Sequence, residues 1–319
     1  MMDVVALGEL LIDFAGVSTD ADGYPTMAAH PGGAPANFLA ALTKYGRNTA
    51  MLGKVGTDAF GKLLLGTLKK AGIETRGLVC AEDVFTTLAF VTIDESGDRS
   101  FSFARKPGAD TQISFEELDL SLIDEAKVFH FGTLSLTDEP ACSATYQAVA
   151  YAKSKGKLIT YDPNLRKPLW KDMDRCKEQL LWGLKQADVV KISDEEVEFL
   201  FGCEPEKGAD ILLNEYGVKL AMATLGAKGA YLKNRTASCY VAGPKVSPVD
   251  TTGAGDIFGG SAVCRLLEME TAPEALTQAQ LLQIGTFAAT AASMSTEVPG
   301  GIPSIPDRQR VEDFVNTRI

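Results

Sequence analysis

The amino-acid sequence predicts a three-layer αβα fold in which a mainly parallel sheet lies between two layers of helices. Short apolar runs alternate with amphipathic stretches along most of the chain. This alternation is typical of α/β proteins with a parallel sheet that is buried on both faces. With 319 residues, of which 45% are hydrophobic, the chain can form one large core. Since no linker or repeat interrupts the pattern, we expect a single domain over residues 1–319.

The expected strands are continuous apolar runs, and the expected helices lie between them. The strands are residues 4–7, 50–55, 128–131, 158–161, 189–192 and 220–224. Apolar residues at helical spacing predict helices over residues 35–45, 58–71, 141–154, 175–186, 194–201, 208–216 and 257–267. The uncharged stretch 275–296 has too many polar residues to cross a membrane, so we expect it to form a buried pair of helices.

Two segments do not follow this alternation. Residues 86–105 alternate in polarity around Glu95-Ser96-Gly97-Asp98, which predicts a hairpin. The other segment, near the N-terminus, is extended and rich in turn-forming residues. We expect the two to form a small antiparallel β-sheet, either a lid or an edge decoration, from about residues 11–28 and 86–106. A thin sheet cannot bury Leu88, Phe90 and Phe103 alone, so we expect two lids to pair in a homodimer.

Composition argues against several classes of function. The net charge of −11 argues against nucleic acid or an anionic membrane as the main partner. The N-terminus lacks the pattern of a secretory signal, and the six cysteines are never closer than 25 residues. That spacing fits no metal site, so we expect reduced thiols in a cytoplasmic protein. His130 lies in an apolar run and is expected in the core, which leaves a Ser-His-Asp hydrolase with little support.

The most informative motif is the turn that ends at Asp256. Gly253 and Gly255 precede an expected helix, and a glycine-rich turn at a helix start presents free N–H groups to a phosphate or a developing anion. A carboxylate in that first helical turn repels a resting phosphate but is well placed to take a proton from an attacking hydroxyl. The residues indicate phosphoryl transfer with Asp256 as base. A tight loop with an ordinary N-terminal helix aspartate is the alternative.

Two other glycine patterns carry no such chemistry. Residues 253–259 read G-x-G-x-x-x-G, which is one residue too long for a dinucleotide-binding fingerprint. Residues 56–63 resemble a P-loop, but Leu63 replaces the Ser or Thr that binds Mg²⁺, so a plain helix entry is expected there.

Polar residues also follow the expected strands, where open parallel sheets bind their ligands. These are Glu9, Asp13, the segment Asp162-Pro163-Asn164-Leu165-Arg166, Lys191, the segment Ser193-Asp194-Glu195-Glu196, and the segment Leu225-Gly226-Ala227-Lys228-Gly229.

Over nearly its whole length the chain resembles the ribokinase-like (PfkB) carbohydrate kinases. The N-terminal signature is similar at Gly32-Gly33-Ala34-Pro35-Ala36-Asn37, and the C-terminal signature at residues 250–256. The resemblance implies a Rossmann-like sandwich with a β lid and an ATP-dependent sugar kinase. The segments 8–14, 101–110, 161–166 and 192–200 look most like fructokinases, which implies transfer of phosphate to D-fructose to give fructose 6-phosphate.

The resemblance also implies a role for each candidate residue. Those near the sugar would be Asp13, Gly32, Gly33, Asn37, Phe103, Arg105 and Asn164. Those at the transferring phosphate would be the base Asp256, with Arg166 and Gly253, and an anion hole formed by the amides of Ala254, Gly255 and Asp256. ATP would contact Lys191, Ser193, Thr224, Gly226, Gly229, Gly253 and Gly255. Glu196 would reach Mg²⁺ through water, and a K⁺ ion would lie near Asp250 and Thr252.

The sequence departs from the family pattern at several places. Leu39 and Ser261 stand where the two signatures usually have other small residues. Ser193 replaces the Asn of the N-x-x-E motif, and Ala288 and Ala289 stand where relatives often carry an Asn near adenine. Ribose, 2-keto-3-deoxygluconate and nucleosides remain alternative acceptors. A catalytically silent sugar- or nucleotide-binding regulator is the alternative from another functional class.

Overall fold

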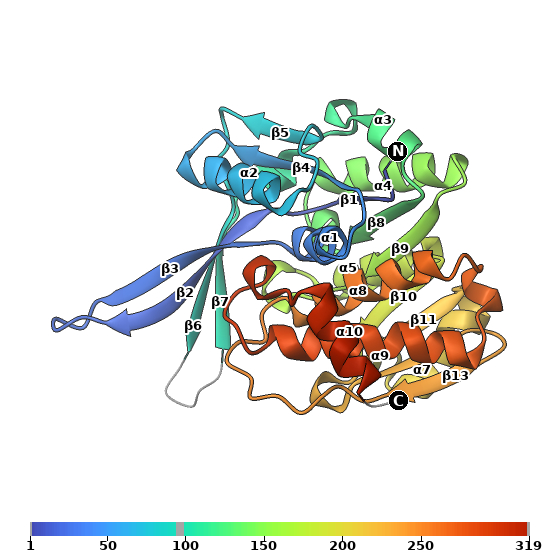
Figure 1. Cartoon of the computed structure of the whole chain (residues 1–319). Helices are drawn as coiled ribbons and strands as arrows, with labels where there is room; N and C mark the ends of the chain where they lie inside the picture. Colours follow the sequence, from blue (N-terminus) through green and yellow to red (C-terminus); the bar gives the residue numbers. More distant parts are fainter. Residues whose placement is uncertain (1, 94–98, 318–319) are drawn as a thin grey trace.

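A nine-stranded sheet runs through the computed structural model of the protein, which describes residues 2–93 and 99–317. It contains all six predicted strands and three more (Figure 1). In spatial order the strands are β13 (Ser238–Val241), β12 (Ala230–Lys233), β11 (Leu220–Thr224), β10 (Val189–Ser193), β9 (Leu158–Asp162), β8 (Val128–Gly132), β1 (Val4–Leu7), β4 (Thr49–Gly56) and β5 (Leu78–Ala81). From β5 to β11 all neighbours are parallel, whereas β12 and β13 form an antiparallel edge.

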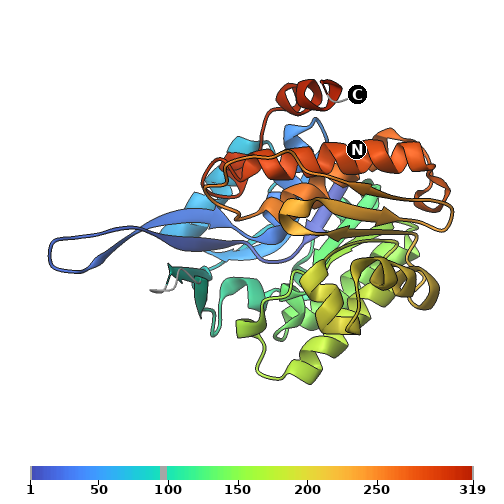
Figure 2. The same cartoon turned by 90° about the horizontal axis from the view of Figure 1, so that it is seen from below.

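Successive residues of each strand enter two different cores, one on each face of the sheet. In β1, Val5 and Leu7 pack in one core, and Val4 and Ala6 in the other. The first core is covered by α3 (Leu120–Glu125), α4 (Ala141–Ser154), α5 (Met173–Gln186), α6 (Asp194–Phe201) and α7 (Pro205–Glu215). The second face is covered by α1 (Ala34–Lys44), α2 (Ala59–Ala71), α8 (Ala254–Glu268) and α9 (Gln278–Ser295). Figure 2 shows the resulting layers. The predicted three-layer α/β fold is therefore confirmed.

A second sheet of four strands, which we call the lid, extends from one edge of the body (Figure 1). Its order is β3 (Pro25–Gly32), β2 (Leu11–Thr19), β6 (Leu88–Ile93) and β7 (Arg99–Ala104). The β2–β3 and β6–β7 pairs are antiparallel, and the two hairpins join through parallel pairing of β2 with β6. The first hairpin continues to Gly32, beyond the predicted end. The predicted turn at 95–98 lies outside the described residues.

Two local predictions have different outcomes. The P-loop-like segment is a helix entry, as predicted, because Asp58 Oδ1 accepts hydrogen bonds from the amides of Phe60 at 2.8 Å and Gly61 at 3.0 Å. The predicted helix pair at 275–296 is wrong, since α9 is a single helix. Gly285 lies inside α9 against Leu232 and Val241 and lets the helix approach the sheet closely. Within the described ranges, no helix combines the length and the hydropathy needed to cross a membrane.

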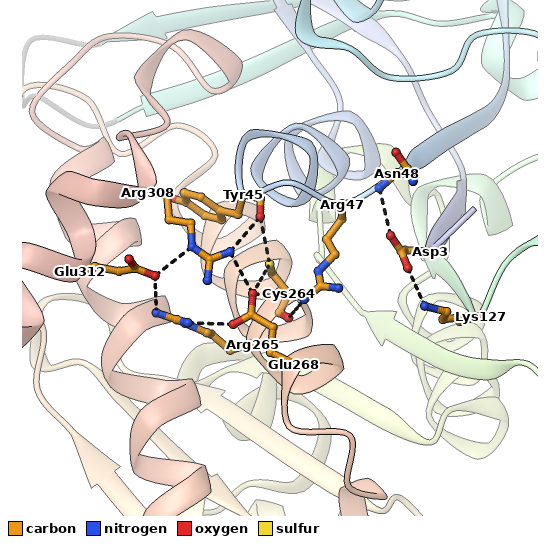
Figure 3. A network of polar contacts seen from close by, with 10 residues as sticks. All are labelled: Asp3, Tyr45, Arg47, Asn48, Lys127, Cys264, Arg265, Glu268, Arg308 and Glu312. Atoms are coloured by element: carbon orange, nitrogen blue, oxygen red, sulfur yellow. Dashed lines mark hydrogen bonds and ion pairs between the residues drawn. The ribbon is translucent and has the colours of Figure 1, made fainter. Parts of the chain in front are cut away.

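Charged side chains fasten the C-terminal helix α10 (Arg308–Asn316) to the end of α8 (Figure 3). Arg308 lies 2.9 Å from Glu268 and 2.8 Å from Glu312. Arg265 contacts the same two carboxylates at 2.7 and 2.9 Å, and Arg47 reaches Glu268 at 3.1 Å. Because these side chains are only partly exposed, the network holds the last turn of α8 in place.

Candidate active site

The first turn of α8 presents two free backbone amides. Gly253 caps the helix with φ of 76°, a left-handed conformation that favours glycine. The amide of Ala254 donates to Thr251 O at 3.2 Å, and that of Ile257 donates to Gly253 O at 2.8 Å. Within the described chain, the amides of Gly255 and Asp256 have no acceptor. The predicted anion hole therefore consists of two amides, because the turn itself uses the third.

Asp256 lies beside these amides and is 9% exposed. Its Oδ2 accepts a hydrogen bond from Asn37 Nδ2 at 2.9 Å, which joins the first turns of α1 and α8. Burial raises the pKa of Asp256, while the bond from Asn37 and the charges of Lys191 and Arg166 oppose this shift. Asn37 Oδ1 is buried and has no hydrogen-bond partner among the residues that the structure describes, so it offers an unused acceptor to a hydroxyl group.

Asp13 lies where lid strand β2 leaves the body, and its carboxylate is half-buried. Burial raises the pKa of Asp13 to about 6, and the charge of Arg166 opposes the shift. A Cβ atom at Gly32 would overlap Asp13 Oδ2, and one at Gly33, where φ is 118°, would lie 2.5 Å from Glu9 O. Glycine at both positions therefore leaves room for the carboxylate and for the start of α1.

Glu9 holds the start of α1, a role that the sequence did not reveal. Its Oε1 accepts a hydrogen bond from the amide of Ala34 at 2.8 Å. The side chain is 3% exposed, and burial raises its pKa to about 7. The only sequence signal was its position after the first strand.

Arg105, predicted near the sugar, lies at the base of the lid. Its Nε donates to Asp110 Oδ2 at 2.8 Å, and its Nη atoms donate to Thr137 Oγ1 at 2.7 Å and to Leu134 O at 2.9 Å. These contacts join the end of β7 to the body. Phe103, two residues earlier, pairs with Ala89 across the lid.

At the ends of β9 and β10, a buried ion pair lies beside the predicted rim residues. Lys191 Nζ is 3.0 Å from Asp162 Oδ2. Asp162 Oδ1 also accepts a hydrogen bond from the amide of Asn164 at 3.1 Å, which stabilises the unusual φ of 45° at that residue. Arg166 follows, and its charge acts on both Asp13 and Asp256. The structure thus gives Asp162, which the sequence placed only at this edge, a direct partner in Lys191.

Glu196 and Ser193 form a capping box at the start of α6. Glu196 accepts hydrogen bonds from the amides of Leu165 at 2.7 Å and Ser193 at 2.8 Å, and Ser193 Oγ accepts from the amide of Glu196 at 3.2 Å. The serine that replaces the family asparagine therefore caps the helix. In the described residues, no group of three or more His, Cys, Asp and Glu side chains is arranged to hold a metal ion.

The predicted nucleotide side follows β11. Thr224 ends this strand, and Gly226 and Gly229, with φ of 55° and 103°, bracket a single 3₁₀ turn. The amide of Leu225 donates to Gly229 O at 2.8 Å and closes the turn. Ala288 and Ala289 are buried within α9.

The predicted K⁺ position lies in a loop that Asp250 organises. Asp250 Oδ1 accepts hydrogen bonds from the amide and the hydroxyl of Thr252 at 2.9 and 2.7 Å, and Oδ2 accepts from the amide of Gly300 at 2.9 Å. These bonds connect residues 250–252 to the segment that follows α9.

His130 is a core residue, as predicted. It is 4% exposed, stacks on Phe38 with 3.8 Å between ring centroids, and shares a 3.0 Å hydrogen bond with Thr160. Burial, with a smaller contribution from Lys191, lowers the pKa of His130 to about 3, so the ring is neutral.

Comparisons with known proteins agree with this geometry. Residues 1–308 match the model of the pfkB family carbohydrate kinases. The chain is 40% identical over 309 residues to fructokinase-2 of Solanum lycopersicum, which covers 95% of this chain and 93% of the relative.

Solved structures with bound ligands have the same fold. A fructokinase of Xylella fastidiosa with bound ATP has a TM-score of 0.91 and 28% identity, covering 100% of this chain and 99% of its own. A double mutant of the fructokinase of Vibrio cholerae O395, with fructose, ADP and potassium ion bound, has a TM-score of 0.87 and 30% identity, covering 98% of each chain.

Proposed function

Because the chain belongs to the pfkB family of carbohydrate kinases, we propose that it transfers the γ-phosphate of ATP to the C6 hydroxyl of D-fructose. The observation that carries this proposal is the first turn of α8, where a buried carboxylate lies beside two free amides. A proton acceptor and an anion site within one helical turn are what phosphoryl transfer to a hydroxyl requires.

In the reaction, Asp256 accepts the proton of the C6 hydroxyl while the hydroxyl oxygen forms a bond to the γ-phosphorus. The bond from this phosphorus to the β–γ bridging oxygen breaks and releases ADP. The amides of Gly255 and Asp256 donate hydrogen bonds to the oxygens of the phosphoryl group while it is being transferred. Arg166, whose charge already acts on Asp256, adds positive charge on the same side.

The sugar binds between the body and the lid. Asp13 accepts hydrogen bonds from two neighbouring hydroxyl groups, because one carboxylate offers two oxygens. The free Oδ1 of Asn37 accepts a third. Phe103 of the lid, together with Arg105 and Asn164 at its base, closes the sugar site, and closure excludes water as a competing acceptor.

ATP lies along the ends of β10 and β11, against Ser193, Thr224 and the Gly226–Gly229 turn. Water and the phosphate oxygens of ATP would hold Mg²⁺ here, because these are the ligands that this ion usually keeps. Glu196, both of whose oxygens accept backbone amides, would reach it only through water. When bound, Mg²⁺ neutralises charge on the phosphate oxygens. The oxygens of Asp250 and Thr252 suit a K⁺ ion.

We also propose that two copies pair through their lids and that the protein works in the cytoplasm. Leu88 and Phe90 in β6 remain only partly buried in one copy. All six cysteines are free, as in proteins of a reducing compartment. Light scattering at micromolar concentration tests the dimer, and a monomeric mass would refute the pairing.

A coupled assay of ADP production across a panel of acceptors tests the activity. We expect the highest kcat/KM with D-fructose, and little ADP release without sugar. A much higher value with ribose, 2-keto-3-deoxygluconate or a nucleoside would replace the substrate and leave the family unchanged. No sugar-dependent ADP release with any acceptor would favour a silent binding protein.

A further inference from the structure

Lys191 lies beneath the first turn of α8, although its motif suggested a place at the nucleotide. Its side chain is buried, with the residue 8% exposed, and Nζ lies 3.0 and 3.3 Å from the two oxygens of Asp162. A Cβ atom at Gly255 would lie 3.0 Å from the same Nζ. Gly255 therefore gives the ammonium group close access to the turn that carries Asp256.

The arrangement follows from the alternation of side chains along two neighbouring strands. Val190 and Ile192 enter the core on the far face, so Lys191 points to the face that α8 covers. Asp162 points to the same face from β9. A cavity of only about 10 Å³ lies between the pair, the His130 ring and α8, which is too small for more than one water molecule. The ammonium charge is thus poorly screened on its inner side.

The charged groups around Asp256 come from three strands, one helix and the segment after β9. The cations are Lys191 of β10 and Arg166 of the segment after β9. The carboxylates are Glu196 of α6, Asp162 of β9 and Asp13 of β2. Arg166 is half-buried at the rim, whereas Lys191 is the buried cation of the set. Without Lys191, the carboxylates of Asp256, Asp162 and Glu196 would repel one another, and Arg166 at the rim would be the remaining cation of this set.

We propose that Lys191 is a positioning residue that keeps Asp256 ionised, and that Asp162 limits this effect by sharing the ammonium charge. We assign Lys191 this role in place of the predicted contact with ATP, because its ammonium is bound to a carboxylate beneath the helix. The proposal rests on Asp256 being the catalytic base. Burial favours the protonated form of Asp256, and the Lys191 charge opposes that shift.

The test uses two substitutions that must move the pH profile in opposite directions. A base works only when deprotonated, so kcat/KM falls as the pH drops through the pKa of Asp256. Lys191→Met removes the cation, and we expect the acid limb to move to higher pH by about one unit. Asp162→Asn removes a carboxylate and frees the ammonium group, so the limb moves to lower pH. Lys185→Met, an exposed lysine on α5, controls for net charge and leaves the limb in place.

The Kd for ATP separates this role from a nucleotide contact. Loss of a direct ammonium–phosphate bond would raise Kd by more than about tenfold, whereas a positioning role leaves it within that limit. A weakened Kd with an unmoved acid limb would overturn the inference. If Lys191→Met fails to fold, the acid limb of the Asp162→Asn profile decides the question alone. A limb that stays in place or moves to higher pH refutes the inference. Full turnover in Asp256→Asn would instead refute the proposed base.

Discussion

Replacing Asp256 with asparagine tests the assignment of the base most directly. Asp256→Asn preserves the size of the side chain, and the new amide oxygen can still accept the 2.9 Å hydrogen bond from Asn37 Nδ2. What disappears is the proton acceptor and one negative charge beside the two free amides of α8. The change therefore separates chemistry from packing.

The expected loss follows from the role of a general base. Removing such a group lowers kcat by about 10²–10⁴, which corresponds to about 3–5 kcal/mol of transition-state stabilisation. The affinity for ATP should hold or improve, because a carboxylate facing the phosphates is gone. Stability should hold or rise, since burial raises the pKa of Asp256 and ionised Asp256 therefore destabilises the folded state at neutral pH.

Three measurements on one preparation decide the matter: kcat with fructose, the Kd for ATP, and Tm. Asp174→Asn is the matched control, because Asp174 also lies in the first turn of a helix but is exposed on α5. This control should leave all three values unchanged. A structural aspartate would give the opposite pattern, with a lower Tm and nearly normal kcat. Near-normal turnover in well-folded Asp256→Asn protein would refute the mechanism.

Three further predictions concern the sugar site and the C-terminal helix. Asp13→Ala should lower kcat/KM for fructose by an amount equal to about 2–4 kcal/mol of transition-state stabilisation. The Kd for ATP should not change. If the KM and kcat for fructose are unchanged as well, Asp13 is only a turn residue. Calorimetric fructose binding to Asp256→Asn protein should weaken as the pH falls through about 6, the raised pKa of Asp13; a flat profile would contradict this. Glu268→Gln should lower stability by about 1–2 kcal/mol and spare kcat. Burial opposes ionisation of Glu268, but bonds from Arg308 and Arg265 outweigh it and lower its pKa, so the stability difference should shrink as acid protonates the wild-type carboxylate. A difference that persists in acid would point to packing instead.

The sequence predicted the elements whose signal is local. A buried parallel strand such as β8 is a continuous apolar run, and the turn before α8 has its own glycines. The short edge strands β12 and β13 were missed, because four-residue segments with polar members give no clear period. α9 was predicted as two helices because its mixture of small, apolar and uncharged polar residues gives no clear period that continues through one long helix.

The site was predictable as a set of residues but not as a set of contacts. Asp13, Asn37 and Asp256 belong to recognisable motifs, and the structure joins the last two directly. Glu9 and Asp162 were named only as polar residues at strand ends and were assigned no role, since a carboxylate after a strand has the same sequence signal whether it is buried or solvated. The amide of Ala254 is not free because it donates a backbone hydrogen bond to Thr251 O. The residue types in this turn do not predict that bond.

The contact between Asn37 and Asp256 spans 219 positions of the chain, and this separation bears on synthesis. When α1, β4 and β8 of a nascent chain have emerged from the ribosome, α8 has not yet been translated. This helix covers the same face of the sheet as α1. Until α8 emerges, Lys191 and Asp162 are not covered by it, and the apolar side chains of α1 that pack on α8 remain exposed to water. The kinase should therefore gain activity only after nearly its whole length is translated, in one late step.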